Sequence, residues 1–116
     1  MKSRVLIAAL VLLACRGAYA ADDLVSVAPD RCKILREDDK VRVIEFIARS
    51  GERIPIHSHP AHVVYFIKAG ATLFTLPDGS TRSVRPKDGS AVINPAMHHA
   101  HEHVEDSHVI LVELKQ

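Results

Sequence analysis

Short apolar runs separated by turn residues fill most of the chain beyond residue 20. Runs of this length that are rich in Val, Ile, Phe and Tyr are typical of β-strands. The predicted strands are Val41–Ile47, Ile54–His59, Val63–Ile67, Ala71–Leu76, Ser80–Arg85, Ser90–Asn94 and His108–Leu114. Between two of them, Pro77-Asp78-Gly79 predicts a hairpin turn. Because no sustained helical period accompanies these runs, the pattern predicts an all-β sandwich or barrel.

Two segments are less regular. Pro29–Arg36 fits a short turn of helix as well as it fits a strand. Pro55 lies within a predicted strand and has no N–H to donate, which indicates an edge strand or the start of a strand. With 116 residues, the chain has room for one domain.

The N-terminus follows a different pattern. Lys2 and Arg4 are followed by an unbroken apolar run to Cys15 and then by Ala18-Tyr19-Ala20. A membrane-spanning helix needs about 20 apolar residues, so this run is too short to span. A charged start, a short apolar middle and an A-x-A end are typical of a secretory signal peptide. We therefore expect a signal peptide over 1–20 and one periplasmic or secreted domain over 21–116.

A lipoprotein is the alternative for this segment. Leu12-Leu13-Ala14-Cys15 loosely resembles a lipoprotein box, in which Cys15 would be acylated and anchor the protein. In the exported form without that anchor, Cys32 is the only cysteine and cannot form an internal disulfide. We expect Cys32 to be a small, partly buried hydrophobic side chain.

Charge and composition argue against some classes of function and draw attention to histidine. Fifteen basic and 14 acidic residues give a formal charge of +1, which provides no basic surface for nucleic acid. Histidine is the unusual residue: all eight lie between His57 and His108. Neutral imidazole is a common ligand of transition metals. The sequence therefore indicates a metal-binding site, but it does not identify a substrate.

The histidines form two clusters. His57 and His59 are two apart on a predicted strand, so their rings point to the same face. In the second cluster, an extended backbone would place His99, His101 and His103 on one face and His98 on the other. We expect the interior to be too small for all of them, so that some face solvent.

The spacing of these residues resembles the two motifs of the cupin family. Gly51, five residues, His57-x-His59, three residues, Val63, six residues and Gly70 match the first motif in spacing. Gly89, five residues and Pro95 match the start of the second, and His99 follows Pro95 one position earlier than the family pattern places its histidine. The resemblance covers roughly residues 41–114.

The resemblance implies a small jelly-roll barrel, also called a double-stranded β-helix. It also implies one divalent transition metal ion (Fe, Mn, Ni, Cu or Zn) held by His57, His59 and His99. Val63 stands where the family has a Glu ligand, so the expected site is three imidazoles with open coordination positions. His62 is next to that position, but strand alternation would point it away from the metal unless a bulge intervenes.

Several residues remain open candidates around this site. Met97-His98 replaces part of the Pro-Gly turn of the second motif, which makes His98 the alternative to His99. We expect His103 beside the site or at its rim, and His101 and His108 on the surface. Tyr65 is two residues from Val63 and therefore points to the same face of the predicted strand. It is a candidate to offer its hydroxyl to a bound small molecule.

Two functions fit these observations. One is a metal-dependent enzyme of the dioxygenase or isomerase type that acts on a small molecule. The other is a non-enzymatic periplasmic protein that binds a small ligand or captures transition metal ions. We also expect a homodimer, because the flank of Val41–Ile47 could pair as an edge strand.

Overall fold

The computed structural model of the chain describes residues 22–116. The expected signal peptide and Cys15 lie outside the described residues. A short helix α1 (Leu24–Val27) and a 3₁₀ turn (Pro29–Arg31) precede nine strands. The strands are β1 (Cys32–Glu37), β2 (Val41–Ala48), β3 (Arg53–His59), β4 (His62–Lys68), β5 (Thr72–Thr75), β6 (Thr81–Val84), β7 (Ala91–Asn94), β8 (Met97–His103) and β9 (Ser107–Leu114).

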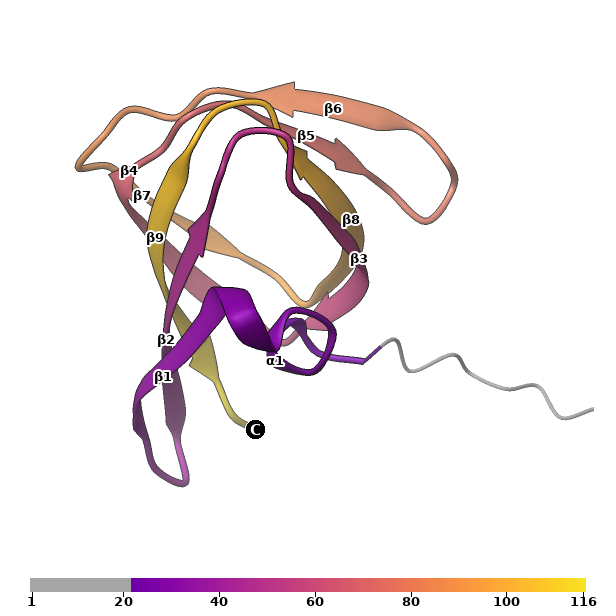
Figure 1. Cartoon of the computed structure of the whole chain (residues 1–116). Helices are drawn as coiled ribbons and strands as arrows, with labels where there is room; N and C mark the ends of the chain where they lie inside the picture. Colours follow the sequence, from indigo (N-terminus) through magenta and orange to yellow (C-terminus); the bar gives the residue numbers. More distant parts are fainter. Residues whose placement is uncertain (1–21) are drawn as a thin grey trace, which may run out of the picture.

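The strands form two antiparallel sheets that enclose a barrel (Figure 1). One sheet has the order β1-β2-β9-β4-β7, and the other has the order β3-β8-β5-β6. The all-β prediction is therefore confirmed, together with every strand that the sequence predicted. The ambiguous segment 29–36 contains both predicted structures, the 3₁₀ turn and then most of β1.

The edges of the sheets follow from the same order. β3, which contains Pro55, is an edge strand of the four-stranded sheet, as its missing N–H indicated. β2 lies between β1 and β9, however, so it has no free edge. The expectation that the flank of Val41–Ile47 pairs with a second copy is therefore wrong.

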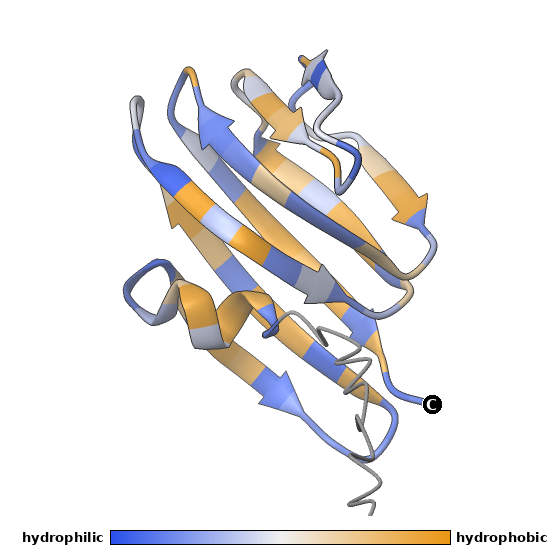
Figure 2. Cartoon of the chain, turned by 90° about the vertical axis from the view of Figure 1, so that its right-hand side faces the viewer, coloured by the Kyte–Doolittle hydropathy of each residue, from blue (hydrophilic) through white to orange (hydrophobic). Residues whose placement is uncertain are grey.

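Successive side chains of a strand point to opposite faces, so every second residue enters the barrel. Hydrophobic and hydrophilic residues alternate along several of the strands (Figure 2). Ile44, Phe46, Val64, Val109 and Leu111 point inward from the five-stranded sheet and form most of the apolar core. Leu24 of α1 packs against the same core. The described residues also bury six histidines, and these give the barrel a polar side. They are His57, His59, His62, His99, His101 and His103.

Gly51 and Gly70 flank the first histidine motif, and both have a positive φ, 87° and 61°. Residues other than glycine rarely adopt such a conformation. At Gly70 a Cβ atom would also overlap the carbonyl oxygen of Asp106. The two motif glycines therefore shape the ends of β3 and β4 and thereby position the histidines between them.

Candidate metal centre

The pairing of β3 with β8 brings the two histidine clusters together. His57 lies opposite His99 in the antiparallel register, and His59 lies opposite Met97. Because residues two apart share a face, His101 and His103 join them on the inner face of the four-stranded sheet. The register of β3 shifts between Ile54 and His57, and this irregularity surrounds Pro55.

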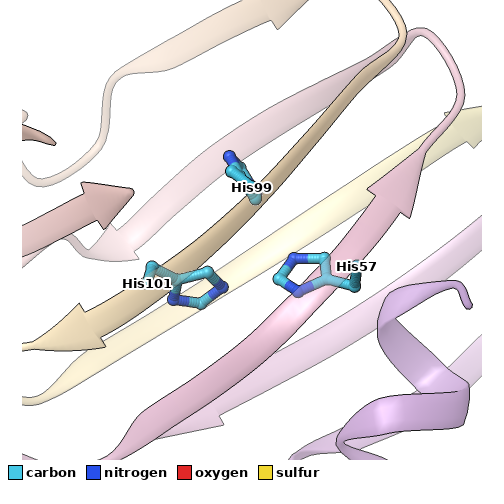
Figure 3. A group of neighbouring side chains, drawn as sticks. All are labelled: His57, His99 and His101. Atoms are coloured by element: carbon cyan, nitrogen blue, oxygen red, sulfur yellow. The ribbon is translucent and has the colours of Figure 1, made fainter. Parts of the chain in front are cut away.

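Three of these side chains form a compact group. Each of His57, His99 and His101 offers one ring nitrogen, and the three nitrogens lie within 4.8 Å of one another. Figure 3 shows His57 on β3 and the other two on the neighbouring strand, with the rings of His57 and His101 facing each other. All three side chains are buried. This arrangement could hold a metal ion.

Hydrogen bonding at His57 leaves its second nitrogen free for a ligand bond. Its Nδ1–H donates to the carbonyl oxygen of Pro55 over 2.7 Å, so Nε2 carries a lone pair. Within residues 22–116, the buried Nε2 atoms of His57 and His99 have no hydrogen-bond partner. Buried polar atoms are nearly always paired, so these two nitrogens are available to bind a ligand.

His59 belongs to a different contact network. Its Nδ1–H donates to Oε2 of Glu113 over 3.2 Å, and Glu113 is itself buried on β9. Oε1 of Glu113 accepts from Nε and Nη2 of Arg42 at 2.9 and 2.6 Å. Arg42 also contacts Asp23 at 2.7 Å. The carboxylate fixes the imidazole with Nε2 free, as carboxylates that accept a hydrogen bond from a metal-ligating histidine do.

The predicted ligand set is therefore placed on one face of the barrel, although the compact group differs from it. The ring centroid of His59 is 4.7 Å from that of His57 and 5.1 Å from that of His99. The three-nitrogen group nevertheless contains His101 in place of His59. The prediction that His59 is a ligand stays a prediction, with His101 as the residue that sequence reasoning missed.

Burial keeps these imidazoles neutral. It lowers the pKa of His57 to about 4 and the pKa of His99 to about 3. It also lowers the pKa of His101, and the neighbouring histidines lower it further. Metal ions bind imidazole only in its neutral form. Near neutral pH the three side chains are therefore ready to bind an ion without first losing a proton.

The carboxylate of Glu113 is held in its charged form. Burial would raise the pKa of Glu113, but hydrogen bonds from His59 and Arg42 and the positive charge of Arg42 lower it instead. The charged form accepts the His59 N–H more strongly than a protonated carboxyl would. Glu113 is thus a negative group in direct contact with His59, although it does not line the cavity.

His62 differs from its expected position. It points into the barrel rather than away from it, and it is buried. Its Nδ1–H donates to the carbonyl oxygen of Pro60 over 2.7 Å, and Nε2 accepts from the Asn94 amide over 3.3 Å. Its ring centroid lies 4.6 Å from that of His59. Both ring nitrogens of His62 are paired, which separates it from the group of His57, His99 and His101.

Tyr65 also lies on the opposite face of β4 from the one expected. Val64 and Phe66 line the cavity, whereas Tyr65 is 45% exposed and is not among the lining residues. The geometry therefore offers the Tyr65 hydroxyl no route to a ligand in the cavity. Val63 points away from the barrel with Tyr65, so the position that lacks the family's Glu does not face the site.

The remaining histidines divide between the two faces. His101 and His103 are buried, so the expectation of a surface position for His101 is wrong. Their rings share a hydrogen bond of 2.7 Å between His101 Nδ1 and His103 Nε2. His98 is exposed on the opposite face of β8. His108 lies on the outer face of β9, where its Nε2–H donates to Glu45 over 3.0 Å.

A cavity of about 310 Å³ adjoins the histidines. This is the low end of the range for small-molecule pockets, about 300–1,000 Å³. Most of its lining is apolar and comes from both sheets, including Phe46, Val64, Phe66, Phe74 and Val109. The ring of Phe74 packs against His99 and His101, with ring centroids 4.8 and 5.5 Å apart. A small molecule in this space would lie next to the three-histidine group.

Cys32 has no role in this site. It is half-buried at the start of β1 and packs against the core, as expected. Burial raises the pKa of its thiol to about 11. The reactive thiolate is therefore scarce near neutral pH.

Comparison with solved structures identifies this architecture as the cupin fold. A cupin domain from Bordetella pertussis superposes with a TM-score of 0.65 at 19% identity, covering 73% of this chain and 92% of that one. An RmlC-like cupin protein from Desulfovibrio desulfuricans covers 98% of this chain and 96% of its own, with a TM-score of 0.55 and 18% identity.

A third neighbour gives the fold its descriptive name. It is an RmlC-like cupin family protein with a double-stranded β-helix fold from Methanocaldococcus jannaschii, with a TM-score of 0.58 and 20% identity over 72% of this chain and 78% of that one. No protein-family model matches the sequence, and no curated protein matches it. The chain therefore has the cupin fold, and the jelly-roll prediction is confirmed.

Proposed function

We propose that the protein binds one divalent transition metal ion inside the barrel and holds a small molecule in the adjoining cavity. The observation that carries the metal proposal is the pair of unpaired, buried Nε2 atoms of His57 and His99. Together with a nitrogen of His101, they converge within 4.8 Å. Because all three donors are neutral imidazoles, a bound ion would keep its full positive charge and its open coordination positions.

The cavity favours an enzyme or a small-molecule binder over a metal-capture protein. A bound ion with open positions would supply Lewis acidity to an oxygen of the small molecule. Metal capture would instead use several ions and the outer histidines. Of these, His98 is exposed alone on β8 and His108 is paired with Glu45. The described residues contain a single group that could hold an ion, so we propose one ion per chain.

Metal analysis tests this proposal directly. The purified protein is reconstituted separately with Fe, Mn, Ni, Cu and Zn, desalted, and measured by mass spectrometry. About one equivalent of at least one ion is expected. The double variant His57→Gln/His99→Gln should lose that ion, and the outer-face control His108→Gln should keep it. Circular dichroism confirms that each variant is folded. Stoichiometric metal in the double variant, or none in the wild type with any of the five ions, would refute the proposal.

Export is a separate part of the proposal and rests on the N-terminal pattern of Lys2, Arg4, the apolar run and Ala18-Tyr19-Ala20. The full chain, expressed in a Gram-negative host, should be recovered from the periplasm with Ala21 as its first residue. Ala20→Asp should block cleavage. An acylated N-terminal Cys15 would instead establish the lipoprotein. No helix within residues 22–116 is long and apolar enough to cross a membrane.

A further inference from the structure

Arg82 is the only charged side chain among the residues that line the cavity, taken over residues 22–116. It lies on β6, which is an edge strand of the four-stranded sheet, and its side chain is solvent-accessible. In the antiparallel register it is opposite Phe74. Directly opposed residues share a face with their Cβ atoms about 5 Å apart. Arg82 is therefore one cross-strand step from the ring that packs against His99 and His101.

The carboxylates around the barrel are used elsewhere. Glu113 pairs with Arg42 and His59, Glu105 pairs with Arg85, and Glu102 pairs with Arg53. Arg82 has no ion pair within the described part of the chain, and no Asp or Glu lines the cavity. A guanidinium at the edge of an apolar space presents several N–H donors in a planar fork that matches a carboxylate.

We propose that Arg82 is a specificity residue that selects a small carboxylate-bearing molecule with an apolar body for this cavity. The apolar lining would hold the body, and Arg82 would hold the carboxylate at the β6 edge. This inference deepens the proposed function and rests on it for the second positive centre, the metal ion beside His57, His99 and His101. Two positive centres in one cavity without a carboxylate of its own favour an anionic ligand over a neutral or cationic one.

Benzoate and benzyl alcohol form a suitable pair of probes, because they share an aromatic body and differ in the charge of one substituent. Their binding is measured by titration calorimetry on metal-loaded protein and on chelator-treated protein. Wild type should bind benzoate more tightly than benzyl alcohol in both states. Arg82→Gln should weaken benzoate binding about 10- to 100-fold, the usual effect of losing a charge-assisted hydrogen bond. It should leave benzyl alcohol unchanged.

Two control variants separate the role of Arg82 from general charge. Arg82→Lys keeps the positive charge without the planar fork and should recover part of the benzoate affinity. Arg85→Gln makes the same charge change three residues away, at a side chain that is outside the cavity lining and paired with Glu105. It should bind benzoate as wild type does. All variants should keep the metal content of wild type, because Arg82 is not a metal ligand.

The outcomes distinguish this inference from the metal proposal. If Arg82→Gln binds benzoate as tightly as wild type while metal content is intact, the inference about Arg82 fails alone. If wild type shows no saturable benzoate binding at millimolar concentration, or no preference over benzyl alcohol, the inference also fails. If wild type holds no metal but Arg82 still discriminates benzoate, the metal proposal fails and the carboxylate site stands.

Discussion

At the residue scale, the site depends on which nitrogen of each imidazole is already engaged. His57 and His59 both donate through Nδ1, to a backbone carbonyl and to a carboxylate respectively. This leaves Nε2 of each ring with a lone pair inside the barrel. The backbone contact of His57 is local, since it comes from Pro55 two residues earlier. The contact of His59 depends on Glu113, which is 54 residues away.

Glu113→Gln tests the prediction that His59 is a metal ligand in addition to the group of His57, His99 and His101. The amide can accept one hydrogen bond, but it loses the charge that holds Arg42 and His59 together. Removing such a partner usually weakens metal affinity about 10- to 100-fold. We expect a weakening of that size in a competition titration with a chromogenic chelator.

The chain offers a matched control for this substitution. Glu45 accepts from His108 over 3.0 Å on the outer face of the barrel, so Glu45→Gln breaks a carboxylate–imidazole pair of the same kind away from the site. Its metal affinity should equal that of wild type. Equal affinities for both variants would show that Glu113 acts only on folding and not on the site.

The buried neutral histidines also predict the stability of the metal-free protein at acid pH. His57 and His99 have folded-state pKa values of about 4 and about 3, below the unfolded value of 6.5. Between these pH values the unfolded chain protonates both imidazoles, whereas the folded chain keeps them neutral. The free energy of unfolding therefore decreases as pH falls from about 6.5 towards 4. Urea denaturation of chelator-treated protein at several pH values measures the slope of the unfolding free energy against pH.

The variant His57→Gln/His99→Gln removes two of these titrating groups, so its slope between pH 6.5 and pH 4 should be shallower than that of wild type. His108→Gln, on the outer face, should keep the wild-type slope. An unchanged slope in the double variant would mean that other groups dominate acid unfolding.

At the element scale, the sequence predicted seven of the nine strands outright, but it left β1 and β8 open and did not predict the phase of β4. Val63–Ile67 is apolar at every position, so its pattern alone does not say which side chains face inward. The spacing of the first motif suggested Val63 and Tyr65. Pairing with β7 and β9 instead turns His62, Val64 and Phe66 inward. A shift of one residue moves every side chain of a strand to the opposite face. This is why His62 points inward and Tyr65 points outward, the reverse of what was expected.

The second cluster was misjudged for a different reason. Alternation correctly placed His99, His101 and His103 on one face of β8. The sequence could not show that the two sheets leave a cavity that accepts all three rings. It also could not show that His101 and His103 hydrogen-bond to each other, which compensates part of the cost of burying them. Such contacts depend on tertiary packing and leave no mark on spacing.

Gly70 tests how closely the connection after β4 is constrained. Gly70→Ala must accommodate both a positive φ and a Cβ atom at the carbonyl oxygen of Asp106. Gly79→Ala faces a positive φ of 84° with nothing near its Cβ, so it isolates the backbone effect. We expect Gly79→Ala to cost about 1 kcal/mol and Gly70→Ala at least about 2 kcal/mol of unfolding free energy. Equal losses in urea denaturation would show that the loop of Asp106 moves freely.

At the scale of the whole molecule, the outer face of the five-stranded sheet is unusually apolar. Ile93, Val63, Val112 and Val43 lie opposite one another across β7, β4, β9 and β2 and form an apolar row, which ends at Arg36 of β1. Ile93 is 82% exposed, and Tyr65 and Ile67 extend the patch along β4. Apolar patches of this kind mark interaction sites on soluble proteins. The homodimer expected from the sequence could form through this face.

A two-fold contact that places these four apolar residues against their copies brings no like charges together. We therefore expect a homodimer that forms through sheet faces rather than through an edge of β2. Sedimentation or mass photometry of the wild type should give twice the chain mass at micromolar concentration. Ile93→Lys should give a folded monomer, since it would bury two ammonium groups at the contact. Ile56→Lys, at an exposed position of β3 on the other sheet, should remain dimeric. A wild-type monomer would exclude this interface, and a dimer that persists in Ile93→Lys would place the contact on another surface.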